Sequence, residues 1–316
     1  MERFNQYRDR GSGIAPFLPV PLQPAPGCCP LPVRVFLFVF RLPFFIFLCA
    51  SYFLVLQWLP IGSLGKKAAL WCILGIPSIW WVDLQVDGVR KGQLSQERSR
   101  LPGPRSIIAA SFTSPIDALY LAAIFDPIFT ASYPNVREVE EISLGSAMLR
   151  ALDAPQVNPP RGAKMTTLSA LETKYPNRPI VAFAECTTTN GRGILPLSPA
   201  ITLISSTAKI FPVSLRYQPE DITTPIPGHY LNFLWALLSK PTHCIRVRIA
   251  EPVMKAGVTR GFNDKMKDST YETNYFDVMD ENLLDSVGES LARLGRVRRV
   301  GLTVADKGRF VNEWKR

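Results

Sequence analysis

The chain has 316 residues, of which 47% are hydrophobic, a content that excludes a wholly disordered protein and allows one large domain with an appendage. Its net charge of +10 favours an acidic partner, such as nucleic acid, anionic lipid or a phosphorylated small molecule, without choosing among them. The six cysteines show neither a CxxC pair nor metal-ligand spacing, so we predict reduced thiols in a chain that faces the cytosol.

The N-terminal 34 residues are rich in proline, glycine and arginine and lack hydrophobic periodicity. We therefore predict a disordered tail over residues 1–34, with a proline-recognition ligand as the alternative. Residues 35–59 then read VFLFVFRLPFFIFLCASYFLVLQWL, with one charge, and exceed the roughly 20 residues that cross a bilayer. A signal peptide would be shorter and nearer the N-terminus. This run predicts a membrane helix.

A second apolar run, Ala68–Leu84, contains Pro77 and ends in a tryptophan pair that suits the membrane interface. We predict that it either spans the membrane or dips into it and returns. Arginines before the first run, with Arg90 and Lys91 after the second, favour a hairpin that has both ends in the cytosol. The alternative is a buried helical pair packed on the main domain. Residues 35–84 are thus assigned to a membrane anchor of one or two helices.

After Gln85, short apolar strands alternate with amphipathic helices, the pattern of an α/β domain, which we assign to residues 85–260. The predicted strands are residues 106–110, 179–184, 209–215 and 244–250. The predicted helices are residues 116–125, 142–152, 164–175, 199–206 and 281–294. The basic C-terminal segment, residues 261–316, is predicted as a helical extension that either lies against anionic lipid or forms a solvated closing helix.

The first polar motif, SFTSPID over residues 111–117, lies where a predicted strand gives way to a predicted helix. Such a turn exposes side chains at the carboxyl edge of a sheet, where open α/β folds bind ligands. The Ser-x-x-Asp spacing of Ser114 and Asp117 is also the signature of a helix N-cap, which would explain both residues without a function. Taken alone, the motif favours the cap.

The second polar motif follows another predicted strand and reads FAECTTTNGRGIL over residues 183–195. It offers hydroxyl groups, backbone N–H groups and a guanidinium at one sheet edge, and these groups suit a phosphate. It matches neither the P-loop nor the dinucleotide fingerprint, so an ordinary polar loop is the alternative. The two motifs together, with Phe211-Pro212-Val213 in the next strand, favour a substrate site.

The two motifs and their spacing resemble the lysophosphatidic acid acyltransferases of the glycerolipid acyltransferase family. That family has Asn-His-x-x-x-x-Asp as its first motif and Phe-Pro-Glu-Gly-Thr-Arg-Ser as its later one. Ser111, Phe112 and Asp117 stand where the first motif has Asn, His and Asp, and residues 183–189 stand against the later motif. The resemblance covers residues 35–255, and the tail after Asp280 is similar to fungal members. It implies a mixed sheet flanked by helices, preceded by membrane helices.

In that family, a histidine held by the aspartate takes the proton from the acceptor hydroxyl as it attacks the acyl-CoA thioester, and the later motif holds the glycerol phosphate. Carried over by position, the resemblance implies a catalytic site at Asp117 and at Phe112, the position of the family histidine. The implied substrate-binding residues are Ser111, Ser114, Glu185, Cys186, Thr187, Thr188 and Arg192. No metal or cofactor is implied, because acyl-CoA is a substrate.

Three positions depart from the family motifs, since Phe112 replaces histidine, Cys186 replaces glycine and Thr188 replaces arginine. Phenylalanine cannot accept a proton, and the loss of a general base typically costs about 10²- to 10⁴-fold in rate. Two alternatives are Asp117 acting directly as the base and Cys186 acting as an acyl-carrying nucleophile. Arg192 is the candidate to hold phosphate in place of the missing arginine. The two histidines of the chain are predicted to be structural.

The resemblance implies acyl transfer from acyl-CoA to a lysophospholipid, above all lysophosphatidic acid, in phospholipid and triacylglycerol metabolism. It also implies a place in the endoplasmic reticulum membrane or on lipid droplets, with membrane lipids as partners and the catalytic domain in the cytosol. The alternative function is a catalytically silent lipid-binding or membrane-organising protein on the same fold. A nucleic-acid partner is not expected, because the basic residues form no stripe interleaved with aromatic residues.

Overall fold

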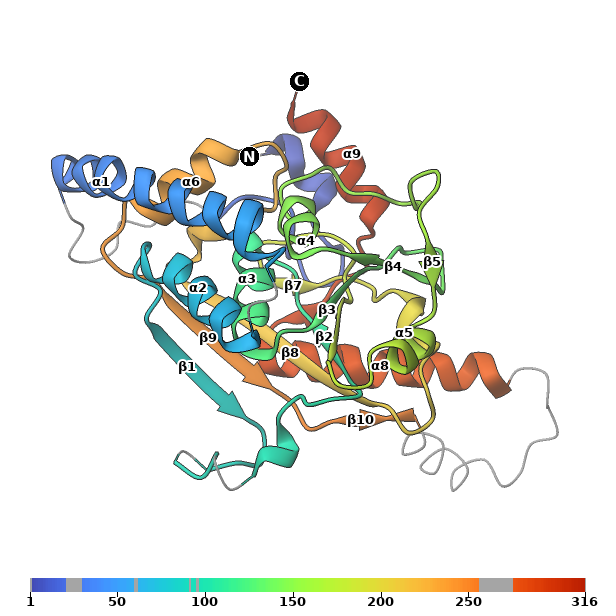
Figure 1. Cartoon of the computed structure of the whole chain (residues 1–316). Coiled ribbons are helices and arrows are strands. Elements are labelled where there is room, and N and C mark those ends of the chain that lie inside the picture. The colour runs from blue at the N-terminus through green and yellow to red at the C-terminus, as the bar shows by residue number, and fades with distance from the viewer. Residues whose placement is uncertain are drawn as a thin grey trace.

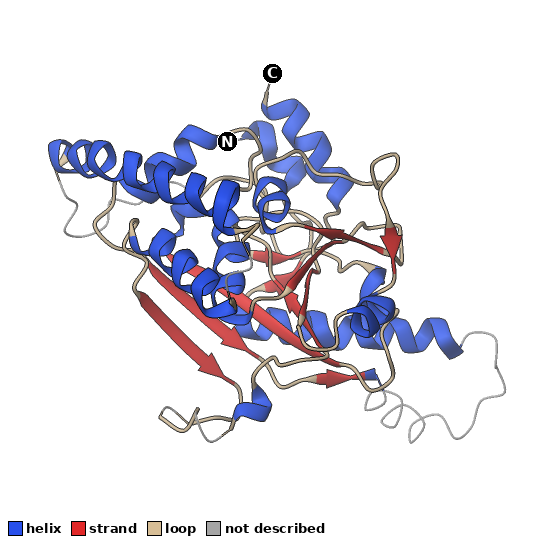
Figure 2. Cartoon of the chain, in the orientation of Figure 1, coloured by secondary structure: helices blue, strands red, loops and turns tan. Residues whose placement is uncertain are grey.

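The computed structural model describes residues 2–20, 30–59, 62–90, 92–94, 97–255 and 275–315. Within these ranges, nine strands form one mixed sheet between helices, and two short strands form a second sheet (Figures 1 and 2). One face of the large sheet packs against helices α2 (Ser63–Gly75), α3 (Pro115–Phe125) and α4 (Leu144–Arg150), and the other against α5 (Leu168–Lys174) and α8 (Tyr275–Gly295). The predicted α/β class with a mixed, helix-flanked sheet is confirmed.

The central strands of the large sheet run parallel. Its order is β1 (Trp81–Val86), β9 (Cys244–Ile249), β8 (Lys209–Gln218), β2 (Ser106–Ala110), β6 (Ile180–Phe183), β3 (Ile128–Ala131), β4 (Val139–Ile142) and β5 (Met165–Thr166), with β10 (Val253–Met254) beside β8. The strands β8, β2, β6 and β3 are parallel neighbours, whereas β9 and β4 pair antiparallel with β8 and β3. Four carboxyl ends therefore meet at one edge of the sheet, where the polar motifs begin.

The strand β2 shows why the centre of the sheet forms from such short apolar runs. Successive side chains of a strand point to opposite faces. Ile108 and Ala110 accordingly enter the core under α2 and α3, while Ile107 and Ala109 enter the core under α5 and α8. A strand that is covered on both faces reads as a continuous apolar run, as SIIAA does.

The strands predicted from apolar runs are confirmed as β2, β6, β8 and β9. The predicted helices are found as α3, α4, α5 and α8, and as the 3-10 helix η4 (Pro199–Thr202). The sequence did not predict the strands β1, β3, β4 and β5, nor helix α6 (Tyr230–Leu238), whereas α9 (Val304–Trp314) lies within the predicted C-terminal helical extension. It also missed the second sheet, in which β7 (Gly193–Ile194) pairs in parallel with β11 (Arg298–Arg299).

The prediction that Ala68–Leu84 forms a second membrane helix is wrong. The run divides into the second half of α2 and the strand β1, whose residues pair in parallel with β9 from Trp81↔Cys244 to Val86↔Ile249. The helix α2 has 13 residues and buries Leu70, Ile73 and Leu74 on the domain. The predicted boundary between residues 84 and 85 therefore lies inside β1, because this apolar stretch belongs to the core and the sheet of the main domain.

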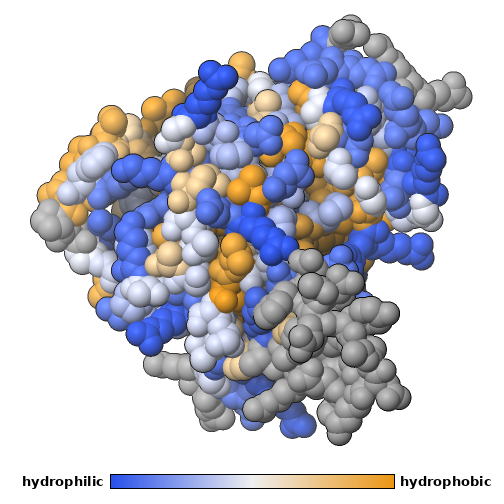
Figure 3. All heavy atoms as spheres, turned by 90° about the vertical axis from the view of Figure 1, so that its right-hand side faces the viewer, coloured by the Kyte–Doolittle hydropathy of each residue, from blue (hydrophilic) through white to orange (hydrophobic). Residues whose placement is uncertain are grey.

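One helix of the described chain is long and apolar enough to cross a membrane, Leu31–Leu56, with a mean hydropathy of 2.2. It consists of α1 (Leu31–Ala50) continued by the π-helix η2 (Ser51–Leu56). Figure 1 shows α1 lying along the surface of the domain beside α6. By contrast, the face of the molecule that carries α5 and α8 is mainly hydrophilic with scattered apolar residues (Figure 3).

The expectation of a disordered tail over residues 1–34 does not hold for residues 2–20. The 3-10 helix η1 (Glu2–Tyr7) packs on α9, and Phe17 is fully buried between them. The hydroxyl of Tyr7 donates to Glu313 at 2.6 Å. The apolar contacts of this segment come from Phe4, Tyr7 and Phe17, and its proline and glycine content does not reveal them. Cys28, Cys29 and Lys91 lie outside the described residues, as do residues 261–274 of the predicted extension.

Candidate functional site

The two polar motifs meet at the carboxyl ends of neighbouring parallel strands. The strand β2 pairs with β6 in a register that sets Ala110 beside Phe183, so residues 111–117 and 184–191 leave the sheet side by side. The loops are joined by their backbones, because the N–H of Thr189 donates to the carbonyl of Phe112 at 3.0 Å. The motifs thus form one connected unit.

Asp117 is fully buried and closes the N-terminus of α3. Its Oδ2 accepts hydrogen bonds from the backbone N–H of Thr113 at 2.6 Å and of Ser114 at 2.8 Å, and from the Thr113 hydroxyl at 3.1 Å. The side chain of Ser114 completes the capping box. The hydroxyl of Tyr217, which lies on β8, donates to Oδ1. The capping role predicted as an alternative is confirmed, and both carboxylate oxygens are occupied.

The protonation of Asp117 is balanced between burial and these donors. Burial raises its pKa to about 6, while the hydrogen bonds from Tyr217, Thr113 and Ser114 oppose the rise. Burial and the charge of Asp117 raise the pKa of Tyr217 well above its ordinary value, so this phenol stays protonated and donates. Tyr217 was not predicted from the sequence, where 100 positions separate it from Asp117. The pair is an acid–base couple without a histidine.

Phe112 packs into the core instead of facing an open cleft. Its ring stacks on Phe183 with centroids 4.2 Å apart and an interplanar angle of 24°. It borders a cavity of about 10 Å³, too small for a substrate, which Cys186 also lines. His229 precedes α6, and His243 bonds to the carbonyl of Leu237 at the end of that helix. His229 is thus a structural turn residue as predicted, whereas His243 lies buried immediately before β9, where the sequence favours a solvated residue at the end of a strand.

Glu185 is also fully buried, at the end of β6. Its Oε2 accepts from the N–H of Leu195 at 3.2 Å, while Oε1 has no hydrogen-bond partner among the described residues. Burial raises its pKa to about 8, and the charge of Asp117 adds to the rise. A carboxyl group with a pKa near 8 is mostly protonated at neutral pH, which suits an unpaired oxygen in an apolar environment.

A buried lysine that the sequence analysis missed reaches the second motif. Lys307 on α9 donates to the hydroxyls of Thr187 and Thr188, both at 2.9 Å, and to the carbonyl of Thr188 at 2.6 Å. Burial lowers its pKa to about 7, against which the charge of Glu185 acts. The sequence carried one signal, since Lys307 lies three residues after Val304 and three before Phe310 in an otherwise apolar helical stripe. Lys307 therefore places an amino group beside Thr188, the position at which the resemblance implies an arginine.

Cys186 has the backbone conformation of a glycine position. Its φ of 59° lies in the left-handed region, which L side chains rarely adopt. Burial raises the pKa of its thiol to about 12, so the group is protonated at neutral pH and is a poor nucleophile. The geometry therefore explains the family glycine at this position and argues against the thiol mechanism.

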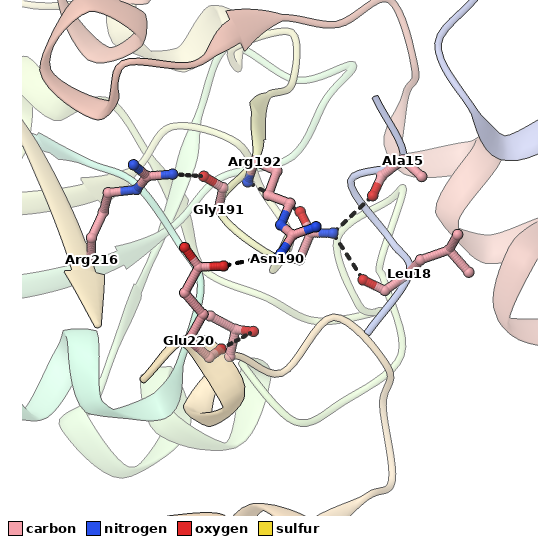
Figure 4. Close-up of polar contacts among 8 residues, drawn as sticks. Ala15, Leu18, Asn190, Gly191, Arg192, Arg216 and Glu220 are labelled. Carbon is pink, nitrogen blue, oxygen red and sulfur yellow. Dashed lines mark hydrogen bonds and ion pairs between the residues drawn. The ribbon is translucent and has the colours of Figure 1, made fainter. Parts of the chain in front are cut away.

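Of the remaining predicted residues, Ser111 has a structural role and Arg192 lies at the surface. The hydroxyl of Ser111 accepts from the N–H of Leu215 at 3.1 Å and ties the first motif to β8. Arg192 lies apart from the two carboxylates, because it pairs with Glu220 at 3.3 Å and lines a different cavity (Figure 4). Phe112 and Arg192 therefore do not border one open cleft with Asp117 and Glu185, since these carboxylates are enclosed by Tyr217, Lys307 and the two loops. The described residues hold no group of three or more His, Cys, Asp or Glu side chains suited to a metal ion.

No protein-family model matches the chain, but two curated proteins do. A Schizosaccharomyces pombe protein named "Putative lysophosphatidic acid:oleoyl-CoA acyltransferase" is 26% identical over 97% of this chain and 96% of its own length. "Lysophosphatidic acid:oleoyl-CoA acyltransferase 1" of Saccharomyces cerevisiae is 24% identical over 80% of this chain and 84% of its own. Both names agree with the resemblance that the motifs indicate.

Among solved structures, a match is the 1-acyl-sn-glycerophosphate (LPA) acyltransferase PlsC from Thermotoga maritima. It covers 82% of this chain and 96% of that one, with 14% identity and a TM-score of 0.35. This likeness is too slight to support an inference.

Proposed function

Because the chain is related to the glycerolipid acyltransferases, we propose that it transfers the acyl group of acyl-CoA to a lysophospholipid, above all lysophosphatidic acid. The observation that carries the proposal is the meeting of the two family motifs at the ends of β2 and β6, with Asp117 and Glu185 kept at the family positions. Such a reaction belongs to phospholipid and triacylglycerol metabolism.

In the proposed reaction, the acceptor hydroxyl oxygen attacks the thioester carbonyl carbon. An ester bond forms, the C–S bond breaks, and the thiol of coenzyme A leaves with the proton that the hydroxyl gave up. We assign the acceptance of that proton to Asp117, whose pKa of about 6 leaves it ionised at neutral pH. The acceptor would replace the Thr113 hydroxyl, because that side chain can rotate whereas the backbone donors cannot. Tyr217 would hold the carboxyl group in place.

Lys307 is proposed to take over part of the role of the missing arginine. Its ammonium group lies 2.9 Å from the hydroxyl of Thr188, the residue at the arginine position. Thr187 and Thr188 are thereby fixed beside Glu185. A cation at this point would offset negative charge that a phosphorylated acceptor brings to the loop.

The deciding experiment is an assay of the purified protein with labelled acyl-CoA and a panel of lysophospholipids. We expect incorporation into lysophosphatidic acid, and a loss of about 10²- to 10⁴-fold in turnover for Asp117→Asn. Asp83→Asn is the matched control, because Asp83 lies on the edge strand β1 and pairs with Arg246 at 3.2 Å, away from the site. Cys186→Ser should retain turnover. Binding of lysophospholipid without any acyl transfer would instead support the silent lipid-binding protein.

A second test concerns Phe112, the position at which the resemblance implies a histidine. Phe112→His alone should gain little, because Tyr217 already occupies Asp117 and the ring at position 112 stacks on Phe183. Combining Phe112→His with Tyr217→Phe frees one carboxylate oxygen for the imidazole, so turnover should rise above that of Tyr217→Phe alone. No gain in the double variant would contradict the placement of the reaction at Asp117.

The membrane attachment is proposed to use one face of α1. The side of the helix that carries Phe38 and Leu42 packs on the core, and Arg41 donates to Ser78 at 2.8 Å and to the carbonyl of Pro241 at 3.2 Å. The opposite side presents a stripe of exposed aromatic residues at helical spacing, Phe36, Phe40, Phe44 and Phe47. A helix that is apolar outward and docked inward suits attachment to the surface of the endoplasmic reticulum or a lipid droplet, with the domain in the cytosol.

Replacing Phe36, Phe40, Phe44 and Phe47 with serine should release the protein from lipid vesicles in a flotation assay. Transfer of each phenylalanine side chain into an apolar phase contributes about 1.5–3 kcal/mol, so the four together should dominate the free energy of membrane attachment. The control is Leu149→Ser, because Leu149 is similarly exposed but lies on α4. Persistent flotation of the fourfold variant would place the attachment elsewhere.

A further inference from the structure

A basic cavity of about 380 Å³ lies beside the second motif. Four arginines come together there from three segments of the chain, with a short N-terminal stretch as their rim. The lining residues are Ser12, Ile14, Arg192, Arg216, Arg296, Val297 and Arg298. We call this set the arginine pocket.

The arginine pocket shares a wall with the candidate site. Arg216 on β8 donates to the carbonyl of Gly191 at 3.1 Å, as Figure 4 shows. A Cβ atom built on Gly191 would lie 3.5 Å from the Thr113 methyl group, and the hydroxyl of Thr113 in turn bonds to Asp117. One residue of backbone, Gly191, therefore lies between the arginines and the loop that holds the proposed base.

Positive charge in the pocket is poorly balanced. Among the residues that the structure describes, Arg216, Arg296 and Arg298 have no ion-pair partner. The pair of Arg192 with Glu220 is about half exposed on both sides, and such pairs contribute roughly 0–1 kcal/mol, so an anion can displace Glu220 easily.

The pKa of the neighbouring Arg248 indicates the same excess of positive charge. Burial lowers its pKa, and repulsion from Arg296, Arg246 and Arg216 lowers it further. Its Nε is buried without a hydrogen-bond partner among the described residues. Like charges that repel one another are stabilised when an anion binds between them.

We propose that the arginine pocket binds a phosphate group carried by a substrate of the acyl transfer reaction. Guanidinium groups match phosphate oxygens with paired hydrogen bonds, and several of them around one cavity suit a doubly charged monoester. The phosphate has two sources, the nucleotide part of acyl-CoA or the phosphate of the lysophospholipid acceptor. The inference rests on the proposed function for the identity of the substrates and on the arginines alone for the binding of phosphate.

The test is direct binding, measured by calorimetry, of coenzyme A, glycerol 3-phosphate and inorganic phosphate. The variant is Arg296→Gln with Arg298→Gln, and Arg192→Gln is a second, independent variant. The control is Arg299→Gln, because Arg299 is the neighbour of Arg298 on β11 but pairs with Asp285 at 2.8 Å outside the pocket. Since a charge-assisted hydrogen bond is worth roughly 1.5–3 kcal/mol, each pocket variant should weaken binding by about tenfold or more.

The arms of the experiment separate the two sources. Weaker binding of coenzyme A together with a higher KM for acyl-CoA would assign the pocket to the donor. Weaker binding of glycerol 3-phosphate together with a higher KM for lysophosphatidic acid would assign it to the acceptor. Arginine-dependent phosphate binding in a protein without acyl transfer would keep the pocket and overturn the proposed function. Unchanged binding of all three probes in an active protein would overturn the pocket.

Discussion

At the scale of single residues, Cys186 shows how a substitution fits a strained position. The left-handed backbone at this residue disfavours any side chain with a Cβ atom, by roughly 1–2 kcal/mol. The cysteine is nevertheless buried, with its sulfur 3.9 Å from the carbonyl of Ala184. Packing of the thiol in the small cavity beside Phe112 offsets part of the strain.

We predict that Cys186→Gly is more stable than Cys186→Ala by about 1 kcal/mol, because both variants lose the thiol but only glycine relieves the left-handed strain. Urea denaturation of the two purified variants measures the difference. An alanine variant at least as stable as the glycine variant would show that the backbone of this residue relaxes and that the strain is not real.

The second prediction at this scale concerns Glu185 and pH. The pKa of Glu185 rises on folding from an ordinary 4.5 to about 8, so the folded state binds the proton more tightly than the unfolded state does. The resulting contribution to stability is fully present below pH 4.5 and is lost as the pH rises through 8. Glu185→Gln cannot ionise and keeps an acceptor for Leu195.

The Gln variant should therefore match the wild type in stability near pH 5 and exceed it at pH 8.5, by on the order of 1–3 kcal/mol. Unfolding by urea at the two pH values tests this difference. Asp117 and Lys307 titrate in both proteins, but both interact with the charge of Glu185, so the pH-dependent difference reports Glu185 together with its effect on these two groups. Equal pH profiles for the two proteins would mean that Glu185 is not the buried acid that its environment indicates.

At the scale of elements, the parts of the chain that could be predicted are those whose cause is local. The apolar run SIIAA fixes β2, and Ser114 with Asp117 fixes the start of α3, because a capping box is a matter of residues three positions apart. The strand β1 could not be predicted, since its residues WVDLQV form a strand only through pairing with β9, more than 150 positions later. Without that pairing, Trp80 and Trp81 favour the interpretation of a segment that ends at the membrane interface.

The site followed the same rule. Its loops were predictable because each follows a strand within the chain, but Tyr217 and Lys307 were not, because they meet Asp117 and Thr188 from 100 and 119 positions away. The closure of the site depends on these two distant side chains. The sequence motifs therefore predict which loops form the candidate site but not the side chains that enclose it.

The helix α9 supplies the prediction at this scale. Lys307→Met keeps most of the unbranched side chain but leaves the Thr188 carbonyl and two hydroxyls without their donor, which should cost about 1–3 kcal/mol in the free energy of unfolding. Arg309→Met on the same helix is the control, because Arg309 is largely exposed and should change stability by less than about 0.5 kcal/mol. Thermal unfolding of the two variants measures the difference in their stability. Equal losses in both variants would place the effect in the helix and not in the buried ammonium.

At the scale of the whole molecule, the two ends of the chain close over the second motif together. Asn190 donates to the carbonyls of Ala15 and Leu18, both at 2.8 Å, as Figure 4 shows. Its backbone N–H donates to Pro16 at 2.9 Å. The N-terminal stretch and α9 share a third core cluster with few links to the large sheet. The molecule thus has a main core and a separate closure made from its termini.

If the closure is a cooperative unit of its own, a mutation in its core should open it while the sheet stays intact. Phe17 is fully buried in the third cluster, where truncation of a phenylalanine to alanine costs about 3–5 kcal/mol. That loss falls on the docking of the termini and not on the central strands, because Phe17 packs against Phe310 and its neighbours there. Phe17→Ala should therefore speed amide hydrogen exchange in residues 2–18, 187–191 and 304–314 but not in β2 or β6.

Leu149→Ala is the control for this experiment, since Leu149 is exposed on α4 and should change no exchange rates beyond its own helix. Faster exchange in the closure with protected central strands would mean that the site can open without global unfolding, which is what a buried Asp117 requires if it is to meet an acceptor hydroxyl. Uniform loss of protection in β2, β6 and α9 would instead show one cooperative unit. Entry to the site would then have to occur between the loops themselves, through rotation of the Thr113 side chain.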